Sequence, residues 1–189
     1  MINIEEEITN YIAAEIDVLK NLNQEQIEEA FAVLYTAIRA GKTIYCFGNG
    51  GSASTASHFK NDFDKIVGSK LDKKFQFICL NDNIATVMAI ANDISYDDIF
   101  SFQLEGRLKP GDIIIAISGS GNSANVINAV GYAKKCGNTV IGLTGFDGGK
   151  LRLLADVNLR APIHNMQITE DVHLMFNHLL VSILSKFIG

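Results

Sequence analysis

The feature that most restricts the fold of this chain is a local pattern that occurs twice. An apolar run over 43–47 is followed directly by the glycine- and serine-rich segment GNGGSAS (48–54). A second apolar run over 113–117 is followed by SGSGNSAN (118–125). Each pattern predicts a buried strand, a tight loop and the start of a helix, because glycine, serine and asparagine favour turns and helix N-termini. Two such units indicate an α/β fold with a parallel sheet.

Both loops have the composition of anion-binding sites. Backbone N–H groups and serine hydroxyls converge at such a turn, and the helix N-terminus adds about half a positive charge. Neither loop has the lysine of a Walker A motif, and neither reads G-x-G-x-x-G for a dinucleotide. The loops therefore favour the phosphate group of a small metabolite. The alternative is that Ser, Gly and Asn only form turns and helix caps.

The rest of the chain alternates between helical and strand patterns. Strands are predicted over 43–47, 75–80, 113–117, 139–143 and 156–160, and helices over 4–20, 24–40, 52–65, 83–92, 97–107, 122–135, 147–154 and 167–187. We predict one three-layer α/β domain over 1–189, with N-terminal helices (1–41) and an α/β core (42–189). In open sheets of this kind ligands bind at the carboxyl ends of strands, where both loops are expected.

Composition excludes several classes of partner. The 189 residues carry a net charge of −5, so we expect no basic surface for nucleic acid or an anionic membrane. The N-terminus is acidic and no apolar stretch reaches ~18 residues, which predicts neither a signal peptide nor a membrane span. The three cysteines show no paired spacing and are expected to be reduced thiols. We therefore expect a cytoplasmic protein.

Five segments occur in the order, and near the spacing, of one enzyme family. They are GNGGSASTASHF (48–59), AIANDISYDDIF (89–100), SGSGNSANVINA (118–129), IGLTGFDGGKL (141–151) and EDVHLMFNHLL (170–180). Over 2–187 the chain resembles the phosphoheptose isomerases, which are enzymes of the sugar isomerase (SIS) fold. The resemblance implies an aldose–ketose isomerase of phosphorylated sugars. The reaction it favours converts sedoheptulose 7-phosphate, a C7 ketose phosphate, to D-glycero-D-manno-heptose 7-phosphate.

The resemblance also implies a set of substrate-binding residues. In the family, hydroxyls of the second loop and the serine of the first hold the sugar phosphate. Carried over by motif, the substrate-binding residues are Asn49, Gly50, Ser52, Asp93, Ser118, Ser120, Ser123 and Gln167. The family's threonine within the second loop is Gly119 here, so one hydroxyl is missing.

A metal site is the next expectation. His58 and Asp62 are one helical turn apart, so an imidazole and a carboxylate could bind one ion from the same face. The resemblance adds Glu170 and His178, since the family uses His, Glu, Gln and His around zinc. The implied zinc ligands, one ion per subunit, are therefore His58, Asp62, Glu170 and His178. On helical phase alone, Asp171 is closer to His178 than Glu170 is, and it is the alternative ligand.

The implied chemistry is acid–base catalysis through an enediol, with Asp62 as the base and His178 as the acid. Two alternatives remain. One is a non-catalytic SIS protein that senses a phosphosugar or acts as a scaffold, and the other is a different phosphosugar isomerase or a lyase on this fold. Retention of acid–base residues beside the serine loops favours an enzyme, because a pure binder needs only the loops.

The resemblance implies a homotetramer with active sites at subunit boundaries, and the apolar pattern gives a physical reason for one. Both N-terminal helices precede the first strand, so neither is needed as a crossover, yet each carries an apolar stripe. The stripes are Ile8, Ile12, Ile16 and Leu19 in the first helix and Ile27, Phe31, Leu34 and Ile38 in the second. The last helix is also apolar over much of its length. Alternatively, these helices only cover the ends of a monomeric sheet.

Overall fold

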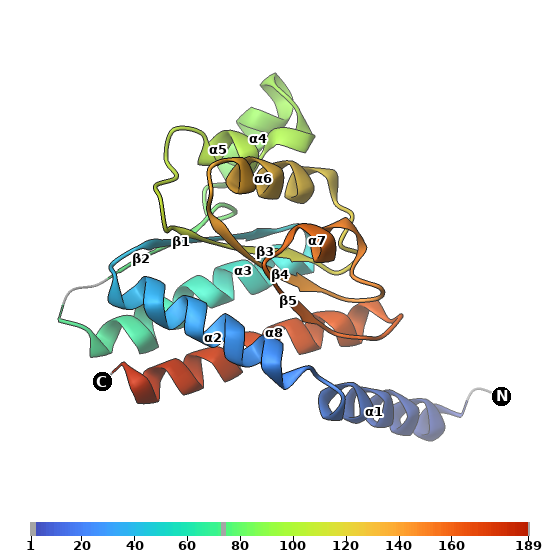
Figure 1. The fold of residues 1–189 in the computed structure, drawn as a ribbon. Helices are drawn as coiled ribbons and strands as arrows, with labels where there is room; N and C mark the ends of the chain where they lie inside the picture. Colours follow the sequence, from blue (N-terminus) through green and yellow to red (C-terminus); the bar gives the residue numbers. More distant parts are fainter. Residues whose placement is uncertain (1–2, 73–74, 189) are drawn as a thin grey trace.

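A five-stranded parallel sheet lies between two layers of helices in the computed structural model, which describes residues 3–72 and 75–188 (Figure 1). The strands are β1 (Thr43–Gly48), β2 (Gln76–Cys79), β3 (Ile113–Ser118), β4 (Thr139–Thr144) and β5 (Val157–Arg160), in the order β2-β1-β3-β4-β5. All four strand pairs are parallel. The predicted three-layer α/β fold is confirmed, and the predicted domain ends at 1 and 189 lie outside the described residues.

Helices cover both faces of this sheet. They are α1 (Ile4–Lys20), α2 (Gln24–Arg39), α3 (Gly51–Asp62), α4 (Ile84–Asp93), α5 (Ser101–Leu104), α6 (Ala124–Lys135), α7 (Gly149–Leu154) and α8 (Met166–Phe187). Most match the expected ranges within two residues. The helix expected over 97–107 is instead a 3-10 turn (Tyr96–Asp98) followed by the single turn α5, and Gly106 at φ +69° lies in the turn that follows.

Alternate side chains of the strands pack into two separate apolar cores, one on each face of the sheet. Ile44 and Cys46 of β1 face α2, α3 and α8, whereas Tyr45 and Phe47 face α4, α5 and α6. This is the pattern of a sheet buried on both faces, and it explains why the strands read as continuous apolar runs. No helix of the described residues is long and apolar enough to cross a membrane.

The N-terminal helices differ in how they pack. Helix α2 lies across the sheet beside α8, and its Leu34 and Ile38 are buried within the chain. That part of the expected surplus apolar surface is therefore used inside one subunit. Helix α1 instead projects away from the body of the molecule (Figure 1), and Val18 is its buried residue. Its stripe stays exposed, with 55% of Ile8 and 52% of Ile12 accessible to solvent.

Candidate active site

The order of strands in the sheet reverses between β1 and β3. Strand β2 is added on one side of β1, while β3, β4 and β5 are added in turn on the other side. The loops that follow β1 and β3 are therefore neighbours, because Gly48 at the end of β1 is in register with Ile117 of β3. Open α/β sheets bind ligands at such a switch point, where two adjacent loops diverge.

The second loop presents serine hydroxyls that do not cap the following helix. Ser123 is the N-cap residue of α6, but its side chain accepts no hydrogen bond from the first turn. Its Oγ lies instead 3.2 Å from the Oγ of Ser118. Ser120 Oγ accepts a hydrogen bond from the Asn122 backbone N–H at 3.2 Å. The Val126 N–H of the first turn donates to Asn125 Oδ1 at 2.9 Å. Because a capping serine normally bonds N–H groups of the first turn, this arrangement leaves the N–H groups of Ala124 and Asn125 for an anion.

The segment that follows β4 braces this loop. The Leu151 N–H donates to the Gly121 carbonyl at 2.9 Å, and the Lys150 N–H donates to Asn122 Oδ1 at 3.2 Å. A side chain on Gly121, whose φ is +67°, would meet the carbonyl oxygen of Gly148. The second loop is thus held by contacts with α7 and the turn before it, at a position that requires glycine.

The first loop is tied to the second by an amide pair. Asn49 and Asn125 exchange hydrogen bonds of 2.8 and 3.0 Å, and Tyr96 Oη donates to Asn49 Oδ1 at 3.1 Å. Gly50 is the N-cap of α3 at φ +53°, and Ser52 is buried in its first turn. The sequence analysis missed Tyr96 and Asn125, although Asn125 lies within the quoted SGSGNSAN segment. Asn49, which was predicted to bind the substrate, therefore joins the two loops.

Three of the predicted catalytic and metal-binding residues lie together. The Nε2 atoms of His58 and His178 are 3.3 Å apart, and Asp62 Oδ2 is 3.2 Å from the former and 3.8 Å from the latter. His58 and Asp62 come from one face of α3, as their spacing predicts, and His178 comes from α8. Their ligand atoms are close enough together to hold one metal ion.

Two amides hold the Asp62 carboxylate in place. Asn177 of α8 donates to its Oδ2 at 2.8 Å, and Asn61 donates to its Oδ1 at 3.2 Å. Helix α3 then widens into a π-helical turn, Phe63–Val67, directly after Asp62. Such π-turns are frequent at functional sites. Asp62 is thus a nearly buried carboxylate with a fixed orientation, and Asn177 is a third residue that the sequence analysis missed.

The structure does not bring the predicted fourth ligand into this group. Glu170 precedes His178 by eight residues of α8, so about 12 Å of helix separates the two within one chain. Its carboxylate packs instead against Gly51, at the start of α3. The alternative ligand, Asp171, accepts a hydrogen bond of 2.6 Å from Tyr11 Oη of α1. This bond raises the pKa of Tyr11 to about 12.

The two remaining predicted substrate residues lie at the surface. Asp93 is exposed at the end of α4, where it accepts a hydrogen bond of 2.7 Å from Asn92. Gln167 is exposed in the first turn of α8. Neither takes part in the hydrogen bonds that organise the two loops in the described residues, so their roles stay predictions.

A buried polar stripe runs along the inner face of α8. Thr169, His173 and Asn177, spaced four residues apart, are fully buried. Within 3–72 and 75–188, Thr169 Oγ1, Asn177 Oδ1 and both ring nitrogens of His173 have no hydrogen-bond partner. Burial lowers the pKa of His173 to about 4. His173 is therefore neutral at neutral pH. The sequence analysis missed this stripe, although polar residues spaced four apart in an apolar helix were a signal that could have predicted it.

Comparisons with known proteins agree with this architecture. The SIS domain family model matches residues 9–145. A phosphoheptose isomerase from Aliarcobacter butzleri is 38% identical over 165 residues, which cover 86% of this chain and 86% of that protein. One from Shewanella denitrificans is 38% identical over 181 residues, covering 94% of this chain and 91% of that protein. The chain belongs to the phosphoheptose isomerase family of SIS-domain proteins.

A solved phosphoheptose isomerase supports the same family assignment in three dimensions. The structure from Neisseria gonorrhoeae superposes with a TM-score of 0.87 at 30% identity, and the match covers 97% of this chain and 100% of that one. The SIS family model ends at Gly145, so it contains both loops, His58 and Asp62. His178 lies beyond it, on α8. The family resemblance inferred from the sequence is therefore confirmed.

Proposed function

We propose that this protein is an aldose–ketose isomerase that converts sedoheptulose 7-phosphate to D-glycero-D-manno-heptose 7-phosphate. The observation that carries the proposal is the position of His58, Asp62 and His178 relative to the two glycine- and serine-rich loops, which we call the phosphate loops (48–54 and 118–125). The helix that begins at the first loop also carries two of the three acid–base groups. One element thus positions both the anion site and the reactive site.

The dimensions of α3 favour an extended substrate. Six residues separate Ser52 from His58, which corresponds to about 9 Å of helix. A ligand with its phosphate at the first turn must therefore extend along the helix to meet the imidazole. This suits a long sugar chain with a terminal phosphate, and the names of the relatives give the same substrate class.

The mechanism follows from the geometry of the three groups. Asp62, held by Asn177 and Asn61, removes the proton from the carbon next to the carbonyl. His178 delivers a proton to the former carbonyl carbon, while a proton passes from the hydroxyl oxygen that becomes the new carbonyl to the oxygen of the old one. His58, within 3.3 Å of His178 Nε2, orients the second imidazole. Fixed orientation contributes to the rate because the base need not be ordered during the reaction.

The donor set fits a zinc ion. Two imidazole nitrogens and one carboxylate oxygen, all within reach of a common point, are the ligands of a three-residue zinc site. His58, Asp62 and His178 would hold the ion, with Glu170 outside the group in one chain. A bound zinc would polarise the carbonyl of the sugar and stabilise the negative charge of the enediolate.

Substitution of the base tests the proposed activity. We expect Asp62→Asn to lower turnover by at least a hundredfold, since a positioned base contributes about 10²–10⁴, and to abolish exchange of the substrate's carbon-bound proton with D₂O. Asp64→Asn, which removes an exposed carboxylate from the same region, is the control and should leave both unchanged. A wild-type protein that binds the sugar phosphate but exchanges no proton would instead be a non-catalytic SIS protein.

Metal analysis tests the zinc site. Protein purified without chelator should contain about one zinc per chain, and His178→Ala should lower both metal content and turnover. Removal of the metal by dialysis against a chelator should lower turnover, and added zinc should restore it. Full activity after metal removal would leave Asp62 and His178 as an acid–base pair that needs no ion.

We also propose that the protein is a cytoplasmic homotetramer. The exposed apolar stripe of α1 supports self-association, because Ile4, Ile8 and Ile12 cannot reach the apolar cores of their own subunit. The described cysteines are all free thiols, which suits a reducing compartment.

A further inference from the structure

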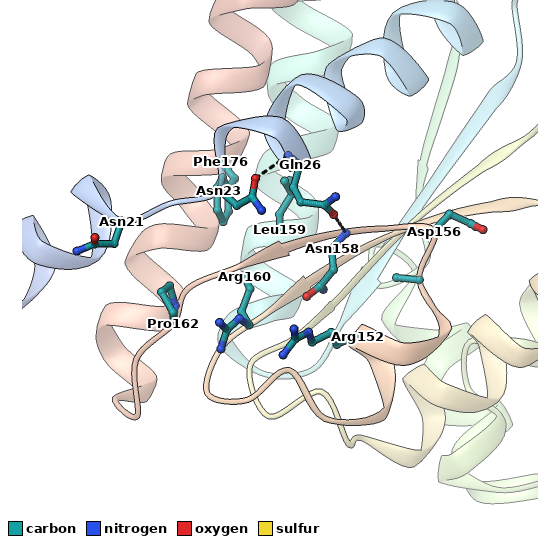
Figure 2. Close-up of a pocket in the computed structure, with 11 residues that line it drawn as sticks. Asn21, Asn23, Gln26, Arg152, Asp156, Asn158, Leu159, Arg160, Pro162 and Phe176 are labelled. Atoms are coloured by element: carbon teal, nitrogen blue, oxygen red, sulfur yellow. Dashed lines mark hydrogen bonds between the residues drawn. The ribbon is translucent and has the colours of Figure 1, made fainter.

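A cavity lies along β5, at the edge of the sheet farthest from β2. Its volume is about 380 Å³, within the usual range for small-molecule sites. Strand β5, helix α7 and the turn between α1 and α2 supply most of the lining residues, and Gln26 of α2 and Phe176 of α8 are also among them (Figure 2). None of the described residues placed in the candidate active site lines it. The cavity is therefore a separate feature of the molecule.

Two guanidinium groups face this cavity (Figure 2). Arg152 comes from α7, and Arg160 is the last residue of β5. Among residues 3–72 and 75–188, neither forms a salt bridge. Arg160 donates to the Phe146 carbonyl at 2.8 Å and Arg152 to the Asp147 carbonyl at 3.4 Å. Because a guanidinium has five N–H donors, most of both groups is left for a ligand.

The carboxylate beside the cavity does not neutralise these arginines. Asp156 accepts hydrogen bonds from Lys134 Nζ and from the Val140 backbone N–H. Both of its oxygens are therefore engaged with other partners. The described lining has two arginines without carboxylate partners, in a chain whose net charge is −5. A local excess of positive charge in an acidic protein favours an anionic ligand.

The wall around the arginines is already ordered. Gln26 Oε1 accepts the Asn158 backbone N–H of β5 at 2.8 Å, and the Asn158 side chain bonds the Gly142 carbonyl at 3.0 Å. Asn23 Oδ1 caps α2 through the Gln26 N–H at 3.1 Å. Its amide nitrogen has no acceptor in the described part of the chain and can donate to a ligand. A preformed wall lowers the entropic cost of binding.

We propose that this cavity binds a phosphate monoester of a small polyol or sugar, at a site separate from the candidate active site. Two guanidinium groups that line the same cavity match the charge and the hydrogen-bonding needs of a phosphate dianion. The remaining volume and the Asn23 amide accommodate a short hydroxylated chain. The inference does not depend on the isomerase activity, because it uses no residue of that site.

Calorimetry with glycerol 3-phosphate tests the proposal. The titrated protein carries Ser120→Ala and Ser123→Ala, which remove hydroxyls of the phosphate loop. We expect one glycerol 3-phosphate per chain, and at least tenfold weaker binding when Arg152→Gln is added. Arg107→Gln is the matched control, because this exposed arginine lies outside the cavity, and it should leave the affinity unchanged. Malonate is the carboxylate probe and should bind more weakly than the phosphate ester.

Three results would overturn the proposal: no binding to the loop variant, equal affinity with and without Arg152→Gln, or tighter binding of malonate. A measurement on the unaltered protein avoids any effect of the substitution on folding. Phenylglyoxal modifies accessible arginines, and glycerol 3-phosphate should protect Arg152 from it while Arg107 reacts as before. Equal modification of Arg152 with and without the ligand would also contradict the site.

Discussion

At the scale of single residues, the serine hydroxyls of the second loop are the groups that the phosphate should contact. Ser118 and Ser123 face each other instead of capping α6. We expect replacement of Ser120 and Ser123 by alanine to weaken sugar phosphate binding by at least tenfold, since hydrogen bonds to a charged group contribute about 1.5–3 kcal/mol each. Calorimetry with the substrate checks this, and an unchanged dissociation constant would exclude the loop as the phosphate site.

His173 should make the stability of the protein depend on pH. Its pKa is about 4 when folded, against 6.5 for an ordinary histidine, because the ring is fully buried. As pH falls from 6.5 to 4, the unfolded chain therefore takes up a proton that the folded chain does not. The free energy of unfolding should fall by about 3 kcal/mol over this window from this group alone.

Urea unfolding at a series of pH values measures this effect. Carboxylates also contribute in acid, so the wild type is compared with His173→Leu, which fills a similar space without a titrating ring. The difference in slope between the two proteins should approach one proton between pH 4 and 6.5. Parallel curves would mean that His173 takes up its proton over the same pH range in the folded and the unfolded chain.

At the scale of elements, the contact between the second loop (118–125) and the turn before α7 depends on Gly121 and Gly148. Gly121 has a positive φ and lies against the Gly148 backbone. Gly121→Ala should destabilise the protein by more than 1 kcal/mol, on the order of the ~1–3 kcal/mol typical of a strained residue, and weaken phosphate binding. Backbone cannot move aside as a flexible side chain can.

Gly131, in the helix that starts at this loop, provides the control. Gly131 lies within α6 with open space around its Cα. Gly131→Ala should therefore stabilise the protein by about 0.5–1 kcal/mol, because alanine restricts the unfolded chain and favours helix. Thermal unfolding of the two variants should give shifts of opposite sign. A stabilising Gly121→Ala would show that the loop is free to move.

At the scale of the whole molecule, α1 is the element that a monomer leaves unexplained. We expect light scattering to give four times the 20.6 kDa chain mass. Ile8→Glu with Ile12→Glu should dissociate the assembly, because charges replace two apolar side chains that are each more than half exposed in one chain. Asn10→Glu adds a charge to the opposite face of α1 and should leave the mass unchanged. An active wild-type monomer would contradict the tetramer.

The sequence by itself determined the layered α/β fold, the order of its strands and helices, and the approximate limits of most of them. The reason is that apolar runs of five or six residues and glycine-rich turns are local signals, and parallel strands need helical crossovers. The prediction of a helix over 97–107 was wrong, because this segment lacks a strong local signal and forms a 3-10 turn followed by the single turn α5. Local spacing also placed His58 and Asp62 on one face of α3.

Tertiary structure alone decided which distant residues meet. Asn177 reaches Asp62, Tyr96 reaches Asn49, and Glu170 packs on Gly51 rather than joining His178. Such pairs depend on how α8 crosses α3 and on how α4 is followed by a turn, which no local pattern specifies. The cavity lined by Arg152 and Arg160 likewise exists only because β5, α7 and the turn between α1 and α2 come together in the fold. Contacts between elements are set by packing, whereas the elements themselves are set by local sequence.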